Sequence, residues 1–246
     1  MALPVVFVHG VPEDATLWDG VREHITDRET RALNLPGFGT PIPSDFSATK
    51  EAYLAWLVRE LENVPKPFDL VGHDWGGILV DRVVFTRPDL MHTFASDTIS
   101  VSSGKYEWHD LAKVWQTPGA GEAFMQANAS RPVAERAARL VAAGMTPEYA
   151  SHVAHPDPVR DDCILRLYRS APNVSAEWKT DVAPAVPGLF IGGATDPYGS
   201  HTASRAFAQS LGMQTHTFEG VGHWWMLHEP ARAAEVLRAF WGAAEG

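Results

Sequence analysis

One stretch of the chain, residues 71–77, constrains the fold most strongly, because it requires a sharp turn between a strand and a helix. Residues 68–71 before the turn, Phe-Asp-Leu-Val, are mostly apolar and predict a short buried strand. Residues 78–85 after it carry apolar side chains at helical spacing and end before Pro88. Glycines stand two residues before and two residues after Asp74. This pattern predicts a nucleophile elbow with Asp74 at its apex.

An aspartate at the apex decides what chemistry such a turn supports. A carboxylate cannot carry out the acyl transfer of serine hydrolases, but it can attack an electrophilic carbon and form an alkyl ester. The alternative interpretation is a glycine-rich turn in which Asp74 only caps the following helix. Two further motifs favour the catalytic interpretation.

The two further motifs each follow a predicted strand. Asp196 closes the sequence Gly-Gly-Ala-Thr-Asp after one apolar run, and His223 follows the last predicted strand. Taken singly, Asp196 is as easily interpreted as a turn residue as a catalytic acid. His223 is likewise as easily interpreted as an ordinary loop histidine as a catalytic base. Together with Asp74 they give the chain order nucleophile, acid, histidine, which predicts a catalytic triad at the carboxyl ends of strands.

The rest of the chain alternates apolar strands with amphipathic helices, which predicts an α/β fold with a mostly parallel sheet. We expect about six strands, with the sheet shortened at its N-terminal edge. The expected strands cover 5–8, 30–35, 68–71, 91–96, 186–191 and 213–218, and the expected helices cover 15–25, 48–61, the segment after Asp74, 200–211 and 230–241.

Between about residues 100 and 180 the pattern changes to helical spacing punctuated by prolines. We interpret this segment as a helical cap inserted into the α/β core. The expected organisation is therefore a first part of the core at 1–99, the cap at 100–180 and a second part of the core at 181–246.

Composition limits the partners that we expect. The formal net charge of -10 argues against binding to nucleic acid or to an anionic membrane surface. No uncharged run approaches the roughly 20 residues that a membrane-spanning helix needs, and the first residues lack the features of a secretion signal. Cys163 is the only cysteine, so no internal disulfide forms and a reducing cytoplasm fits best. We expect a monomer or a homodimer.

Three segments together resemble the α/β-hydrolases of the epoxide hydrolase and haloalkane dehalogenase group. His9-Gly10-Val11-Pro12 resembles the oxyanion loop of this group, the segment around Asp74 resembles its aspartate elbow, and Gly222-His223-Trp224 resembles its catalytic histidine segment. The resemblance implies an α/β-hydrolase fold and a covalent aspartyl ester that a histidine-activated water hydrolyses. It implies that the backbone N–H groups of Val11 and Trp75 form the oxyanion hole. We expect no cofactor and no metal.

Within this group, the cap favours an epoxide hydrolase acting on a small-molecule epoxide and water. Residues 115–119 and the segment Tyr168-Arg169-Ser170 resemble cap segments of epoxide hydrolases, in which the tyrosine donates a proton to the epoxide oxygen. A haloalkane dehalogenase is the alternative, because the Trp75 indole could hold a halide and Asp97 stands where some dehalogenases carry their acid. A binding protein of the same fold is a third interpretation, but its triad would not need to be complete.

The cap departs from the group at one position, because Leu111 stands near the place of the group's first cap tyrosine. The sequence leaves four possible substitutes open, which are Tyr106, Trp108, His109 and Tyr149. An aromatic side chain such as Tyr168 could instead serve only to pack the cap on the core. The expected substrate contacts are His9, Trp75, Trp108, His109, Trp115 and Trp224.

Overall fold

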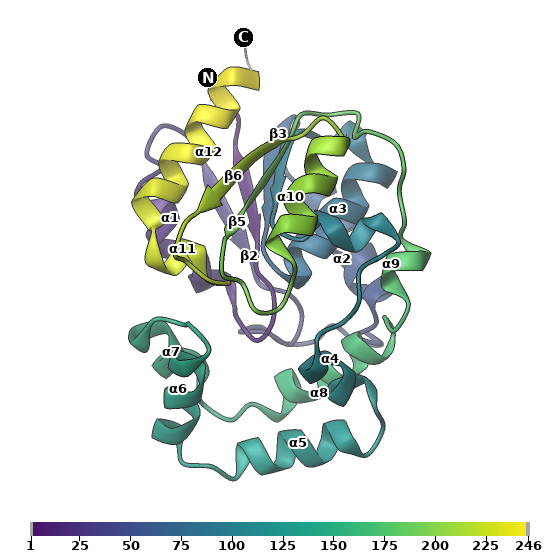
Figure 1. The fold of residues 1–246 in the computed structure, drawn as a ribbon, viewed down its shortest axis with the longest axis vertical. Helices are drawn as coiled ribbons and strands as arrows, with labels where there is room; N and C mark the ends of the chain where they lie inside the picture. Colours follow the sequence, from purple (N-terminus) through teal and green to yellow (C-terminus); the bar gives the residue numbers. More distant parts are fainter. Residues whose placement is uncertain (1, 245–246) are drawn as a thin grey trace.

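The computed structural model describes residues 2–244, and a six-stranded parallel sheet lies at its centre (Figure 1). The strand order is β2-β1-β3-β4-β5-β6, and every neighbouring pair is parallel. The expected α/β-hydrolase architecture with about six strands is therefore confirmed. The strands are β1 (Val5–Val8), β2 (Thr30–Leu33), β3 (Phe68–Gly72), β4 (Met91–Ser96), β5 (Gly188–Gly193) and β6 (Gln214–Phe218).

Helices cover both faces of this sheet (Figure 1). Helices α1 (Asp19–Glu23), α11 (Trp225–His228) and α12 (Pro230–Ala244) contact one another on one face. Helices α2 (Lys50–Glu62), α3 (Trp75–Thr86) and α10 (His201–Ser210) cover the other face, where the short turns η2 (Pro88–Leu90) and η3 (Ile99–Ser103) also lie. Among the described residues, no helix has the length and apolar character needed to cross a lipid bilayer.

The helix expected over 15–25 is divided in the structure. It begins as a 3-10 helix, η1 (Ala15–Trp18), and continues as the short helix α1. The side chain of Asp14 accepts a hydrogen bond from the N–H of Thr16, and this cap starts the tighter turn.

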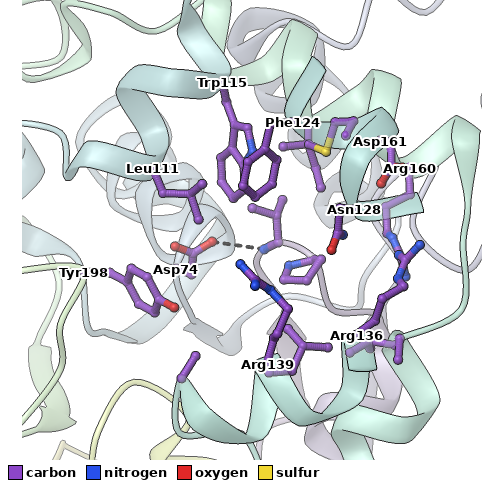
Figure 2. A pocket seen from close by; sticks show the side chains of 18 of the residues that line it. Asp74, Leu111, Trp115, Phe124, Asn128, Arg136, Arg139, Arg160, Asp161 and Tyr198 are labelled. Carbon is purple, nitrogen blue, oxygen red and sulfur yellow. Dashed lines mark hydrogen bonds between the residues drawn. The ribbon is translucent and has the colours of Figure 1, made fainter. Parts of the chain in front are cut away.

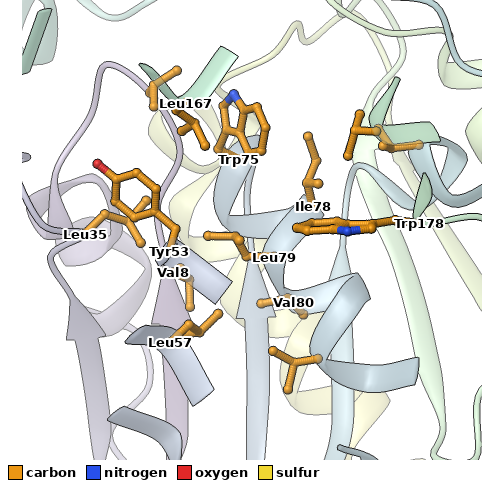
Figure 3. Close-up of a cluster of buried hydrophobic side chains, with 14 of the residues drawn as sticks. Val8, Leu35, Tyr53, Leu57, Trp75, Ile78, Leu79, Val80, Leu167 and Trp178 are labelled. Atoms are coloured by element: carbon orange, nitrogen blue, oxygen red, sulfur yellow. The ribbon is translucent and has the colours of Figure 1, made fainter. Parts of the chain in front are cut away.

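The buried apolar side chains form two clusters, one on each face of the sheet. In β1, Val6 and Val8 join the first cluster while Val5 and Phe7 join the second, because successive side chains of a strand point to opposite faces. The first cluster packs α2 and α3 against the sheet (Figure 3). The second contains Trp18, Trp225 and Trp241 among its largest members.

Most helices of the central segment gather at one end of the molecule (Figure 1). They are α4 (Asp110–Gln116), α5 (Ala120–Ala129), α6 (Val133–Ala142), α7 (Pro147–Val153) and α8 (Pro158–Arg169), and the short α9 (Val174–Glu177) contacts η3 of the core. The segment is thus mostly helical, and we refer to it as the cap.

This cap has two halves that pack on different clusters of the core. Helices α4, α5 and α8 contact one another, and their buried side chains belong to the first cluster. Helices α6 and α7 contact each other, and their segment packs on the second cluster through residues such as Met145 and Tyr149. The space between the two halves therefore opens over the edge of the sheet.

Candidate active site

The turn that carries Asp74 depends on close packing between two backbone segments. Asp74 lies between β3 and α3 with φ 49° and ψ -124°, a strained conformation for a residue with a side chain. At Gly76 an added Cβ would collide with the carbonyl oxygens of Val8 and His9, so glycine lets α3 lie directly against β1. At Gly10 an added Cβ would overlap the Asp74 side chain. The expected elbow is present, and its glycines serve this close approach.

The two carboxylate oxygens of Asp74 differ in their surroundings. Oδ2 accepts a hydrogen bond of 3.0 Å from the N–H of Val11, in the loop after β1. Oδ1 lies 3.9 Å from Nε2 of His223. The N–H of Trp75 belongs to the first turn of α3, where helical geometry leaves N–H groups without an intrahelical acceptor. Oδ2 therefore faces a backbone donor, while Oδ1 lies on the side of His223.

The structure pairs His223 with Asp196 and gives Asp97 a different position. Nδ1 of His223 lies 2.8 Å from Oδ2 of Asp196. Asp97 instead accepts hydrogen bonds of 3.0 Å from the backbone N–H of Asp74 and from the indole of Trp225. Asp97 therefore braces the elbow, and Asp196 orients the histidine ring as a triad acid does.

The charges around His223 control its proton. Burial alone would lower the pKa of this imidazole, but the charge and hydrogen bond of Asp196 and the charge of Asp74 outweigh burial and raise the pKa to about 10. The neighbouring acidic groups therefore favour the protonated form of His223. If Asp74 becomes esterified, its charge disappears and the pKa of His223 falls, which favours the neutral ring that can accept a proton from water.

This ionic arrangement predicts how stability depends on pH. The pKa of His223 rises from 6.5 to about 10 on folding. Its contribution to the free energy of unfolding is therefore complete below about pH 6.5 and is lost as the pH rises through about 10. The free energy of unfolding of the wild type should therefore fall more steeply between these values than that of His223→Gln, by at most about 1.4 kcal/mol per pH unit. Denaturant titrations of both proteins across this range measure the difference. Parallel curves would contradict the assigned charge state.

A cavity of about 550 Å³ separates Asp74 from the cap, and Tyr168 of α8 lines it. The Tyr168 ring is 2% exposed and lies between the rings of Trp108 and Trp115, with centroid distances of 5.0 and 4.8 Å. Burial and the charge of Asp74 raise the pKa of its phenol well above 10. Tyr168 thus keeps its proton at neutral pH and offers it within the same cavity as Asp74.

The four residues considered as a second proton donor in the cap differ in whether they line the cavity. Leu111 does line the cavity beside Asp74, as Figure 2 shows, and has no proton to give. His109 lines it as well, and its Nδ1 accepts from the N–H of Ala112, which leaves Nε2 to carry the proton of the neutral ring. Tyr149, in contrast, contacts the backbone of Asp14 with its hydroxyl.

Tyr106 and Trp108 lie at a smaller cavity of about 40 Å³ that also reaches Asp74. The indole of Trp108 donates to the carbonyl of Ala171, and the Tyr106 hydroxyl lies 3.4 Å from the carbonyl oxygen of Tyr198. The phenol of Tyr198 was not expected from the sequence, yet it lines both cavities and its ring contacts His223. His109 and Tyr198 are therefore the polar groups best placed to assist Tyr168.

Of the other expected substrate contacts, Trp115 and Trp224 line the larger cavity, whereas His9 and Trp75 do not. His9 is fully buried, and its ring is held by the N–H of Leu35 at Nε2 and by the carbonyl of Gly10 at Nδ1. It therefore shapes the loop and does not face substrate. The Trp75 indole nitrogen is buried without a hydrogen-bond partner among the described residues.

Glu13 is a site residue that sequence reasoning missed. It is 1% exposed and accepts a hydrogen bond of 2.8 Å from the indole of Trp224, while its other oxygen has no partner among the described residues. Donor atoms of Glu13, His73 and His223 lie within 4.8 Å of one another. We assign them no metal, because an ion there would occupy the triad histidine. The sequence feature that could have identified Glu13 is its position directly after His-Gly-Val-Pro.

The fold and this site together define a hydrolase of the α/β type. The family model described as the alpha/beta hydrolase family matches residues 5–236, and the chain belongs to this family.

Two curated relatives share part of the chain. An (E)-2-((N-methylformamido)methylene)succinate hydrolase of Acinetobacter baylyi is 28% identical over 94 residues, which is 37% of this chain and 36% of that enzyme. A pimeloyl-[acyl-carrier protein] methyl ester esterase of Aeromonas salmonicida is 27% identical over 118 residues, 44% of this chain and 42% of the esterase. The aligned segments thus span less than half of either relative.

Solved structures match nearly the whole chain. An epoxide hydrolase of Vigna radiata gives a TM-score of 0.78 at 20% identity and covers 98% of this chain and 91% of its own. A loop variant of a haloalkane dehalogenase of Bradyrhizobium elkanii gives 0.75 at 20% identity, with 99% and 90% covered. An esterase of Thermogutta terrifontis gives 0.74 at 20% identity, with 100% and 92% covered. At this identity the likeness shows the fold alone.

Proposed function

We propose that this hydrolase opens an epoxide to a vicinal diol through a covalent ester on Asp74. The observation that carries the proposal is the phenol of Tyr168, buried and protonated, in the cavity that Asp74 faces. The oxygen that leaves an epoxide carbon stays in the product and needs a proton, whereas a halide leaves as a stable anion. A cap phenol over the nucleophile therefore favours an epoxide.

In the first step, Oδ1 of Asp74 attacks an epoxide carbon and the carbon–oxygen bond breaks. The opened oxygen takes the phenolic proton of Tyr168 as it becomes a hydroxyl. The imidazolium of His223 then returns a proton to the phenolate and becomes neutral, which the loss of charge on Asp74 favours. The product of this step is a hydroxyalkyl ester.

In the second step, neutral His223 takes a proton from water, and the water oxygen attacks the ester carbon of Asp74. The negative charge develops on Oδ2, which faces the N–H of Val11. When the intermediate collapses, the diol oxygen leaves with the remaining water proton, and Asp74 returns as a carboxylate. The cycle consumes one epoxide and one water and restores every proton.

Halide release is the second candidate, and the position of Trp75 argues against it. Its indole N–H is the halide donor expected from the sequence, but the nitrogen is buried and Trp75 is absent from the lining of both described cavities. Trp115 does line the larger cavity, and its buried indole nitrogen has no partner among the described residues, so it is the indole that a halide would use there. The preference for an epoxide therefore rests on the Tyr168 phenol.

Tyr168→Phe tests the choice between the two reactions. We expect this variant to open a styrene-type epoxide about a hundredfold more slowly or worse, because it removes the general acid. Its reaction with a bromoalkane should change little, since bromide needs no proton. Diol formation and bromide release, measured side by side, give the comparison.

Tyr149→Phe is the matched control, because its hydroxyl contacts the backbone of Asp14 and lies outside the cavity lining. Full epoxide turnover by Tyr168→Phe would exclude the proposed role. Faster bromide release than diol formation by the wild type would instead identify a dehalogenase.

A further inference from the structure

Three arginines line the cavity, and in Figure 2 Arg136 and Arg160 lie on the side away from Asp74. Arg136 and Arg139 come from α6 and Arg160 comes from α8, and the carboxylate among them is that of Asp161. Guanidinium groups stay charged and are seldom buried without an acceptor. A cavity that binds only apolar molecules would not need guanidinium groups in its lining.

Arg136 is the most informative member of this arginine group. Its side chain lines the cavity, the residue is 4% exposed, and its Nε and Nη1 atoms are buried with no hydrogen-bond partner among the described residues. Burial lowers the pKa of its guanidinium, a shift that Asp161 opposes and Arg160 reinforces. A buried charge without acceptors costs stability, so this arrangement points to an anion that enters from outside the protein.

The charges at this end fit a single negative charge. Arg136 is buried, Arg160 and Asp161 are half-buried, and Arg139 is exposed. Without the exposed Arg139, the charged lining consists of Arg136 and Arg160, which are positive, and Asp161, which is negative. The sum is one positive charge. The amide of Asn128 adds a neutral hydrogen-bonding group to the same lining. A carboxylate matches this charge and the planar fork of a guanidinium.

Helix α8 sets the distance between this end and the reacting centre. Arg160, Ile164 and Tyr168 follow one another at four-residue intervals, so they share one face of the helix, and all three line the cavity. Eight residues of helix rise by about 12 Å. An extended chain of roughly ten carbon–carbon bonds covers that distance.

We propose that the substrate is a carboxylic acid whose carboxylate binds Arg136 and Arg160 while its epoxide, at the other end of a medium-length chain, reaches Asp74 and Tyr168. This inference rests on the proposed function for the identity of the reacting group. The anion site itself can be tested without any reaction.

The first experiment compares the terminal epoxide of undecenoic acid with its methyl ester. We expect kcat/KM to favour the acid by about tenfold or more, because a charge-assisted hydrogen bond to a buried guanidinium is lost in the ester. In Arg136→Met this preference should disappear. Arg131→Met is the matched control, since Arg131 lies just outside α6, pairs with Glu135 and is absent from the lining. Epoxide opening with no preference for the acid would overturn the inference and leave the proposed function standing.

The second experiment measures binding of unreactive undecanoate and of its methyl ester by calorimetry. The wild type should bind the acid more tightly by about tenfold, and Arg136→Met should lose the difference. Selective binding without epoxide turnover would support the anion site and reject the proposed function. Tighter binding of an alkyl phosphate than of undecanoate would overturn the assignment to a carboxylate.

Thermal unfolding of Arg136→Met separates a binding role from a structural one. A guanidinium kept for a ligand lacks protein partners, so its replacement by methionine should leave the melting temperature unchanged or raise it. A large fall in melting temperature would assign Arg136 to the fold, whereas loss of acid preference at unchanged stability supports the site.

Discussion

Asp74→Asn is expected to remove diol formation by at least about ten-thousand-fold, because the amide cannot form the alkyl ester on which both half-reactions depend. The fold should persist, since asparagine tolerates the positive φ of 49° at the elbow and its side-chain oxygen can still accept the N–H of Val11. Diol formation is followed by chromatography, and circular dichroism verifies the fold.

Isotope labelling distinguishes this mechanism from direct attack by water. In a single turnover of the wild type in ¹⁸O-water, the label should enter Asp74, and the first diol should contain none. The diol takes its new oxygen from Oδ1 in this scheme, and water supplies the replacement. Label in the first diol would show that water attacks the epoxide itself, and the covalent mechanism would then be wrong.

His223→Gln should have the second large effect, because it stops the cycle after the first half. Asp74 can still open the epoxide, but no base activates water to hydrolyse the ester. Intact-protein mass spectrometry should show an adduct of one epoxide mass that peptide mapping places on Asp74. Turnover after the first equivalent should fall by about a hundredfold or more.

Two controls make this result specific. His228→Gln changes an exposed histidine of α11 whose Nε2 contacts the carbonyl of Gly144, and it should turn over normally. Combining His223→Gln with Asp74→Asn should abolish the adduct. A folded His223→Gln protein that accumulates no ester would assign the water-activating role to another group.

Much of the fold could be predicted because its signals are local. The strand over residues 91–96 was predicted with the bounds that the structure shows, since Pro88 before it and Asp97 after it delimit the segment. The strand expected over 186–191 instead begins at Gly188 and ends at Gly193, because its backbone continues into the Gly-Gly pair. Pairing with β6 through Gly193 decides that boundary, and pairing is not a local property.

The residues of the candidate site likewise differ in whether a local sequence signal identifies them. Asp74, Asp196 and His223 were predicted because each follows a strand within a short motif, and the structure brings their side chains together. Arg136 and Tyr198 could not be found, because exposed and cavity-lining positions on a cap helix or loop carry the same sequence pattern. Arg136 lines the cavity only because the two halves of the cap face each other, and Tyr198 lies in the loop after β5 beside His223, which only tertiary packing determines.

The division of the cap into two halves has a consequence for how such an enzyme can diversify. Tyr168 is held by the half that rests on the first cluster, whereas Arg136 belongs to the half that rests on the second. In the proposed mechanism, mutations in α6 and α7 would change the contribution of Arg136 to recognition, while α8 keeps Arg160 and Tyr168 in place beside the cavity that Asp74 faces. Related enzymes with this arrangement would be able to change substrate specificity while they keep the same reaction.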